Sequence, residues 1–429
     1  MTSNSFLRVE LPNDNDVASI HELFNAGFDK HGVDLTRKKR LGLHWAIKEG
    51  KSDIVSLLLR HNTVIKGGIK EDEFTVLHMA AKFGNVDILK QLLERNLHIN
   101  AASKTGWTPL HSAVQNGQVD AVKLLLERGA DPKSRVGIGW TALHSAAERG
   151  FKNIAEVLLQ HGAEVSVRNN NGVTPLYKAA YSGHASVLRF LIQRGADPNE
   201  RDTDVRSPLH AAANGDHVEA AKALLEAKAD VDSKDKDGAT PLHWAAAQGY
   251  MDTVNLLLDY GAGIDVQNDR EATALYLAIH FYHESTINLL VERGADVNIG
   301  NFHGWFPLVS AADNGDLKLV EILTKDPKVD LEKKSGDGRT ALHMASVNDH
   351  TNVAVLLLDK GANIHARDWN EWTPLHWAAF RGHLNVVKQL LNRHADMTLV
   401  DDNGQTALQR AEQRGHSKVA EILKKASDE

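Results

Sequence analysis

The sequence predicts an all-α solenoid in which short helical pairs stack one on the next. Three observations predict this fold: a leucine-centred phrase recurs at a fixed period, each period holds two apolar-periodic stretches of helical length, and each period ends in turn-forming residues. A single pair of short helices cannot bury its apolar face alone, so neighbouring pairs must share one continuous core.

The recurring phrase reads TPLHSAV, TALHSAA, TPLHWAAA or a close variant. Eleven steps connect its twelve copies, nine of 33 residues and two of 34, and chance does not keep that register. The leucines of the phrase, which mark twelve repeats over residues 35–425, are Leu43, Leu77, Leu110, Leu143, Leu176, Leu209, Leu242, Leu275, Leu308, Leu342, Leu375 and Leu408.

Each repeat has the same order of elements, as residues 108–131 illustrate. Thr108 before Pro109 predicts a helix start. The threonine hydroxyl can accept from the free backbone N–H groups of the first turn. Proline fits the first helical position because the N–H that it lacks would have no partner there. The first helix is expected to run to about Gly117, and a second follows from Val119. Gly129 and the polar residues after it predict a left-handed helix end and a turn.

These residues resemble the ankyrin repeat, and the resemblance covers about Thr36 to Lys425. It implies helix–loop–helix units with β-hairpin tips, stacked into an elongated, curved solenoid. Its concave surface would consist of the tips and the first helices. The resemblance also implies that the histidine after each motif leucine bonds the turn backbone and the threonine hydroxyl. Eight of the 23 histidines occupy this position: His44, His78, His111, His144, His210, His243, His343 and His376.

The two ends of the chain differ from the repeats. Residues 1–34 are expected to form a helical cap or degenerate repeat, since Val17, Ile20, Leu23 and Phe24 have helical spacing, and residues 426–429 a short tail. Residues 37–40, Arg-Lys-Lys-Arg, are similar to a basic nuclear-import signal, but they fall where a solvated turn is expected.

Composition excludes several classes of protein. A net charge of −7 argues against a dedicated nucleic-acid binder. The absence of cysteine excludes disulfides, thiolate nucleophiles and cysteine-ligated zinc. Apolar runs are far shorter than the ~20 residues that cross a bilayer, and no signal peptide is apparent. The expected protein is therefore an intracellular, cytoplasmic monomer without cofactor, metal or membrane insertion, with the nucleus as an alternative compartment.

Catalytic patterns are weak. His280 and Asp313 occupy equivalent positions on adjacent repeats, about one helix spacing apart, where a base and its orienting group would need extended side chains to touch. There is no nucleophile motif and no phosphate-binding glycine loop. The sequence therefore predicts a protein that is not an enzyme.

Aromatic residues concentrate on the tips and the first helices, and repeats eight to eleven depart most from the repeat pattern. Aromatic side chains are preferred binding anchors, although packing across neighbouring tips remains an alternative for the tryptophans. The residues expected to contact a partner are Trp107, Trp140, Tyr181, His280, Phe281, Phe302, His303, Trp305, Asp313, Trp369, Trp372, Trp377, Phe380 and Arg381.

The resemblance implies a non-catalytic scaffold or adaptor that binds another protein through its concave surface. The alternative is a protein that uses the aromatic and histidine-rich groove of repeats eight to eleven to bind a small molecule or to catalyse a reaction. Fold alone names no partner.

Overall fold

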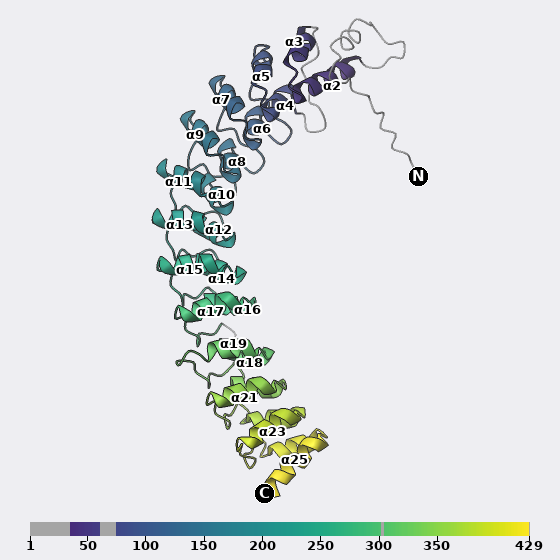
Figure 1. The fold of residues 1–429 in the computed structure, drawn as a ribbon, viewed down its shortest axis with the longest axis vertical. Helices are drawn as coiled ribbons and strands as arrows, with labels where there is room; N and C mark the ends of the chain where they lie inside the picture. Colours follow the sequence, from purple (N-terminus) through teal and green to yellow (C-terminus); the bar gives the residue numbers. More distant parts are fainter. Residues whose placement is uncertain (1–34, 61–73, 302–303, 429) are drawn as a thin grey trace, which may run out of the picture. The chain divides into compact units, whose positions relative to one another are not determined.

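The computed structural model describes residues 35–60, 74–301 and 304–428. The predicted N-terminal cap, residues 1–34, lies outside the described residues. In the described part, 24 helices form twelve pairs and there is no β-sheet, which confirms the predicted all-α solenoid (Figure 1). The chain divides into two compact units, one holding residues up to 179 with 193–196, the other residues 180–192 and 197 onward.

Each pair consists of a first helix, which carries the motif leucine, and a second helix. Four pairs lie wholly in the first unit: α2 (Leu35–Lys48) and α3 (Ser52–Arg60), α4 (Val76–Phe83) and α5 (Val86–Leu93), α6 (Pro109–Gln115) and α7 (Val119–Glu127), α8 (Ala142–Arg149) and α9 (Lys152–Gln160). The unit boundary falls within the next pair, α10 (Pro175–Tyr181) and α11 (Ala185–Gln193).

Seven pairs lie wholly in the second unit. They are α12 (Pro208–Asn214) and α13 (Val218–Glu226), α14 (Pro241–Gln248) and α15 (Met251–Asp259), α16 (Ala274–His280) and α17 (Glu284–Glu292), α18 (Pro307–Asn314) and α19 (Leu317–Leu323), α20 (Ala341–Val347) and α21 (Thr351–Asp359), α22 (Pro374–Arg381) and α23 (Leu384–Asn392), and α24 (Ala407–Gln413) and α25 (Ser417–Asp428). Because α25 continues to Asp428, residues 426–428 of the expected C-terminal tail are helical.

The ends of α14 show why the helices begin and stop where the sequence predicts. Thr240 is an extended N-cap, and its hydroxyl and backbone N–H both lie against Nδ1 of His243. Pro241 occupies the first turn, where no donor is needed. Gly249 ends the helix with a left-handed backbone, φ 78°, which glycine adopts without a Cβ clash.

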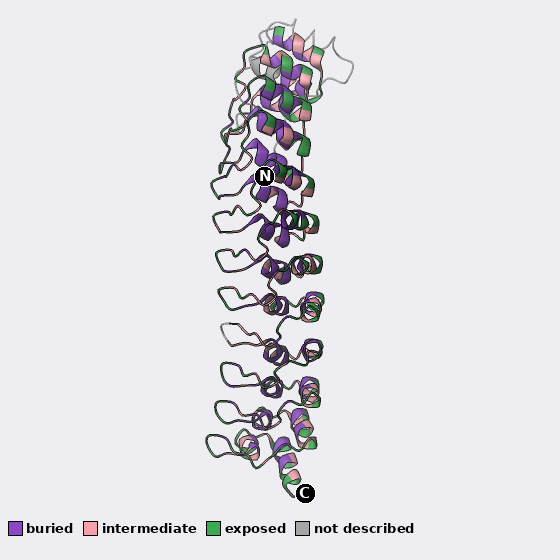
Figure 2. Ribbon diagram, turned by 90° about the vertical axis from the view of Figure 1, so that its left-hand side faces the viewer, coloured by how far each residue is buried: buried purple, intermediate pink, exposed green. Residues whose placement is uncertain are grey.

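The core lies between the first and second helices of successive pairs. Eleven of the twelve motif leucines are buried, and Leu408 in the last pair is half-buried. Small residues such as Ala245 and Ala246 are fully buried, which lets neighbouring helices approach closely. Figure 2 shows the first helices, mostly buried, between the tips on one side and the second helices on the other.

The tips are turns and not the β-hairpins that the resemblance implies. In the described residues only isolated bridges form, Val136 with Trp140 and Val400 with Thr406. Each described tip is closed by a backbone bond, such as Asp235 N–H to the carbonyl of Ala239 at 2.9 Å, together with polar side chains described below. Adjacent tips are joined by single backbone bonds, for example Asp269 N–H to the carbonyl of Asp237 at 3.1 Å.

The expected turn at residues 37–40 is also wrong. These residues belong to α2, which begins at Leu35. The basic run therefore lies on a helix.

Candidate functional site

The motif histidine links each first helix to the tip of the next repeat. In His243, Nδ1 accepts from Thr240 N–H at 3.1 Å, so the proton is on Nε2, which donates to the carbonyl of Ala272 at 2.9 Å. The same bond joins His78 to Trp107, His144 to Val173, His210 to Ala239, His343 to Trp372 and His376 to Gln405. These histidines are structural.

Burial keeps the motif histidines neutral. It lowers the pKa of His111, His144 and His343 to about 4, against an ordinary value of 6.5. An imidazole with this pKa carries no charge near neutral pH, and in His144 and His343 both ring nitrogens are hydrogen-bonded within the fold. Within the described residues, no group of three or more histidine or carboxylate side chains is placed to hold a metal ion.

A second set of histidines starts the second helices and bonds backward to the preceding first helix. His383 Nε2 lies 2.9 Å from the carbonyl of Val347, and His416 Nε2 lies 3.0 Å from that of Phe380. Both sets of histidines hold repeats together. What is left for a partner is the surface of the tips and the exposed side of the first helices, which we call the groove face.

In the first unit, the tip residues Trp107 and Trp140 are half-buried. Each indole N–H donates to a serine on its own first helix, Ser112 at 3.1 Å and Ser145 at 3.0 Å. These rings are fixed against the helix and keep part of their surface open. Tyr181, at the end of α10, is 50% exposed.

In the second unit, a cavity of about 670 Å³ opens on the groove face. It is bordered by the tips of repeats seven to nine and by α16. Two of the predicted contact residues, His280 and Phe281, line it. The lining residues are Asp237, Asn268, Arg270, Ala272, Tyr276, Leu277, His280, Phe281 and Asn301.

The cavity lies where the motif histidine is replaced by Tyr276. The phenol oxygen of Tyr276 accepts from Asn301 Nδ2 at 2.7 Å, and burial raises the pKa of the phenol. The ring of His280 stacks on Tyr276 with the planes 12° apart, and Phe281 packs edge-on against His280 at 4.9 Å between centroids. Phe281 is 52% exposed, so an aromatic edge faces solvent beside the cavity.

The neighbouring predicted residues do not join this group as a catalytic pair. Asp313 Oδ1 accepts from Asn348 Nδ2 at 2.8 Å, and in the described residues no ion pair connects Asp313 with His280. Trp305 is half-buried on its tip, where its backbone N–H donates to Asn301 Oδ1 at 3.1 Å. Phe302 and His303 lie outside the described residues.

A second aromatic group lies on the tips and first helices of repeats ten to twelve. The ring of Trp372 lies 4.5 Å from that of Trp377 and 5.1 Å from that of Phe380, and the guanidinium of Arg410 covers it at 4.8 Å. Trp372 is consequently only 8% exposed. Its assignment as a contact residue is therefore corrected: it is a packing residue, enclosed by side chains of its own and the next repeat.

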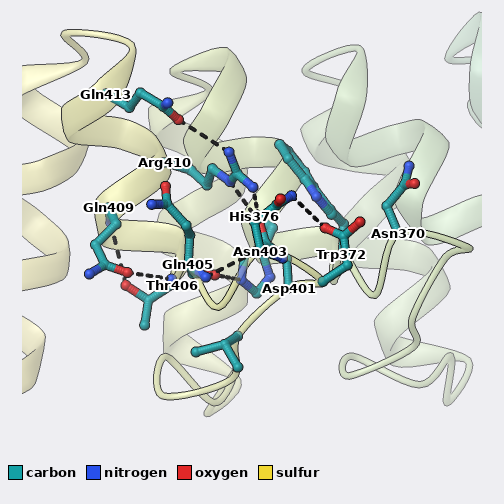
Figure 3. A network of polar contacts seen from close by, with 12 residues as sticks. Asn370, Trp372, His376, Asp401, Asn403, Gln405, Thr406, Gln409, Arg410 and Gln413 are labelled. Carbon is teal, nitrogen blue, oxygen red and sulfur yellow. Dashed lines mark hydrogen bonds and ion pairs between the residues drawn. The ribbon is translucent and has the colours of Figure 1, made fainter.

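Two buried carboxylates hold Trp377 and Arg410 in place by hydrogen bonds. Asp368 Oδ2 accepts from the indole N–H of Trp377 at 2.8 Å, and Asp401 Oδ2 accepts from Arg410 Nε at 2.6 Å. Figure 3 shows Arg410 between Asp401 and Gln413, beside Trp372. Trp377 and Arg410 occupy the same position in successive repeats. Trp377 donates a hydrogen bond to the buried carboxylate of its own tip, and Arg410 forms an ion pair with that of its own tip.

The outer residues of this group are more open. Trp369 is 65% exposed, and its indole N–H donates to the carbonyl of Gly336 on the preceding tip at 3.0 Å. Phe380 is half-buried and Arg381 is exposed. The guanidinium of Arg414, also exposed, stacks over Phe380 at 4.1 Å.

The structure thus separates the predicted contact residues into two groups in the second unit and a few scattered positions. Sequence reasoning missed Tyr276 and Asn301 at the cavity, and Arg339, Arg410 and Arg414 around the second group. Alignment of the repeats carried a signal for Arg410, because it follows Trp377 by one repeat period of 33 residues.

Comparisons with known proteins agree with this architecture. The family model described as ankyrin repeats (3 copies) matches residues 11–103, 43–136, 133–202, 199–268, 261–335, 311–401 and 364–428. Among solved structures, 575 chains match this sequence. One is the human ASB11 ankyrin repeat domain, at 31% identity and a TM-score of 0.48, over 51% of this chain and 96% of that chain. A search of curated proteins found no match. No helix among the described residues has the length and apolar character to cross a membrane.

Proposed function

The chain belongs to the ankyrin-repeat family, and from this premise we propose that it is a non-catalytic scaffold that binds a partner protein through the groove face of its second unit. Ankyrin repeats are in general protein–protein interaction modules. Their stacked construction suits this task, because a surface that is already ordered loses little entropy on association.

The observation that carries the proposal is the exposed aromatic edge beside the cavity. Phe281 leaves half of its surface in water although the scaffold around it is closely packed. Burying an aromatic ring in a partner's pocket is typical of the few residues that dominate binding energy. The ring lies against His280, which limits the rotamer freedom that binding would otherwise cost.

We propose that the other half-buried or exposed candidates of the second unit add peripheral contacts; they are Tyr181, Trp305, Trp369, Trp377, Phe380 and Arg381. Trp107 and Trp140 are proposed as separate contact residues of the first unit. Asp313 is proposed as a polar contact because it is half-buried and its carboxylate accepts from the exposed Asn348. A cytoplasmic monomer remains part of the proposal, and light scattering on the purified chain tests the monomeric state.

The test compares two variants of similar side-chain loss in affinity capture followed by mass spectrometry. Phe281→Ala is expected to weaken retention of the main captured protein by about tenfold or more. Tyr260→Ala, at the end of α15 on the second-helix side and 39% exposed, is the control and should leave retention unchanged. Equal retention by both variants would refute the proposal.

The cavity also supports a second candidate, a small molecule as ligand. Its volume of about 670 Å³ lies within the range of small-molecule sites, and Asp237, Asn268 and Arg270 offer polar groups to orient one. Mass spectrometry of compounds released from the purified chain tests this candidate. A compound that co-purifies with the native chain and not with Leu277→Trp, which fills the cavity, would favour it.

A further inference from the structure

Two arginines on the groove face of repeats eleven and twelve differ from neighbouring arginines in having no carboxylate partner among the described residues. Arg381 ends α22, and Arg414 follows the end of α24 at the equivalent position. Both are exposed, and the guanidinium of Arg414 stacks at 4.1 Å over Phe380, the residue that precedes Arg381. We call Arg381, Arg414 and Phe380 the arginine surface.

Charge pairing sets this surface apart. Arg339 lies 3.2 Å from Asp337, and Arg410 lies 2.5 Å from Asp401, so these two guanidiniums already have carboxylate partners. Among the described residues, no carboxylate lies within 4.0 Å of the guanidinium of Arg381 or Arg414.

Nearby acidic side chains are engaged elsewhere. Glu412 pairs with Lys424 at 2.6 Å, and Glu371 pairs with Arg367 at 2.7 Å. The exposed Asp349 lies against His383 at 3.8 Å. In the described part of the chain, the two guanidiniums of the arginine surface therefore make no contact ion pair. Their positive charge contrasts with the net charge of −7 of the whole protein.

We propose that the arginine surface binds an acidic segment of a partner protein, with aspartate or glutamate side chains on Arg381 and Arg414 and an apolar side chain on Phe380. The proposal rests on the proposed function and names the chemistry of the partner. A guanidinium presents a planar fork that matches a carboxylate. Stacking on Phe380 holds the fork of Arg414 in place before binding, which lowers the entropy cost.

The packed group behind this surface makes it rigid. Phe380 packs edge-on against both Trp372 and Trp377, at 5.1 and 6.1 Å, and its backbone carbonyl accepts from His416. A binding residue supported on this many sides keeps its position when the partner arrives. Electrostatic attraction of this kind also raises the association rate, and salt weakens it.

The experiment selects peptides from a random library displayed on phage, using the full chain as bait. We expect the enriched peptides to carry more aspartate and glutamate than the library. Fluorescence anisotropy of a labelled enriched peptide should then show affinity about tenfold or more lower for Arg381→Ala/Arg414→Ala. Affinity should also fall between about 50 and 500 mM NaCl.

The matched control removes the same charge from the other side of the repeats. Arg293 and Arg393 follow the ends of α17 and α23 and pair with Asp259 and Asp359 at 2.6 and 2.9 Å. The variant Arg293→Ala/Arg393→Ala should bind the peptide as the native chain does. Circular dichroism and thermal unfolding confirm that each variant is folded.

Charge reversal provides a gain of function that loss of folding cannot imitate. Arg381→Glu/Arg414→Glu should prefer a peptide in which lysine replaces the acidic residues. Enrichment of basic or purely apolar peptides, or unchanged affinity of the double alanine variant, would overturn the proposal. If Phe281→Ala alone abolishes peptide binding, or if no peptide is enriched, the arginine proposal fails, whereas the proposed function is decided by the affinity-capture comparison.

Discussion

Acid should unfold this protein at a pH set by its buried histidines. In the folded chain burial lowers the pKa of His111, His144 and His343 to about 4, whereas in the unfolded chain it is near 6.5. Between these values the unfolded chain binds more protons, so the free energy of unfolding falls as pH falls. The stabilisation is complete above pH 6.5 and is lost as the pH approaches 4.

The magnitude follows from the two pKa values. Moving from about pH 7.5 to about pH 5 should cost roughly 2 kcal/mol for each such histidine. In His343, Nδ1 accepts from Thr340 N–H and Nε2 donates to the carbonyl of Trp372. A protonated ring would lose the first bond because Nδ1 could no longer accept.

The assay is urea unfolding followed by circular dichroism at both pH values, on the native chain and on His343→Gln. The last repeat supplies the reason for glutamine: at the same motif position, Gln409 Oε1 accepts from Thr406 N–H at 2.8 Å, so the cap survives without a titratable group. The variant should lose about 2 kcal/mol less than the native chain on acidification. An identical loss in both proteins would refute the assignment.

Four further substitutions test the core and the aromatic groups by the same unfolding measurement. Leu242→Ala should cost about 2–5 kcal/mol by opening a core cavity, and a harmless result would mean that the repeat register is wrong. Trp372→Ala should cost about 3–5 kcal/mol, whereas Trp369→Ala, three residues earlier on the same tip, should cost less than about 1 kcal/mol; equal costs would contradict the burial. Trp377→Phe should cost about 1–2 kcal/mol by leaving a buried oxygen of Asp368 without its indole donor, and a neutral effect would argue against that bond.

The fold could be predicted from the sequence because its determinants are local. Helix caps, the small residues of the first helices and the motif leucines all lie within one period, and repetition multiplies a weak signal twelve times. Eleven of the motif leucines are buried as predicted. The tips were less predictable. Whether the backbone pairing within a tip extends beyond a single bond or bridge into a hairpin cannot be read from the residue types of one period.

The candidate site was only partly predictable, because burial on the groove face depends on the neighbouring repeat. Trp369 and Trp372 share one tip and the same residue type, yet the first is exposed and the second is enclosed. The residue that closes over Trp372 is Arg410 of the next repeat, and the cavity at Tyr276 depends on Asn301 of the next tip. Reading one repeat at a time cannot supply these contacts.

In three tips of the second unit, the first polar residue is an aspartate that bonds a side chain nine residues later on the first helix. In repeat eleven, Asp368 uses Oδ1 to accept from two tip N–H groups, at 2.9 and 3.0 Å, which leaves Oδ2 in need of a donor. Trp377, nine residues later, supplies it. Asp235 with Trp244, and Asp401 with Arg410, repeat this arrangement.

An asparagine at the same position has no such requirement. Asn268 Oδ1 accepts from the backbone N–H groups of Arg270 and Ala272, both at 3.0 Å, and its side chain has no second acidic oxygen to neutralise. The residue nine positions later can then be Leu277, which is smaller than tryptophan and reaches no tip acceptor. Leu277 and Asn268 both line the 670 Å³ cavity. Repeat eight thus combines an amide on its tip with Leu277 on its first helix beside the cavity, whereas repeats seven and eleven combine a tip carboxylate with an indole.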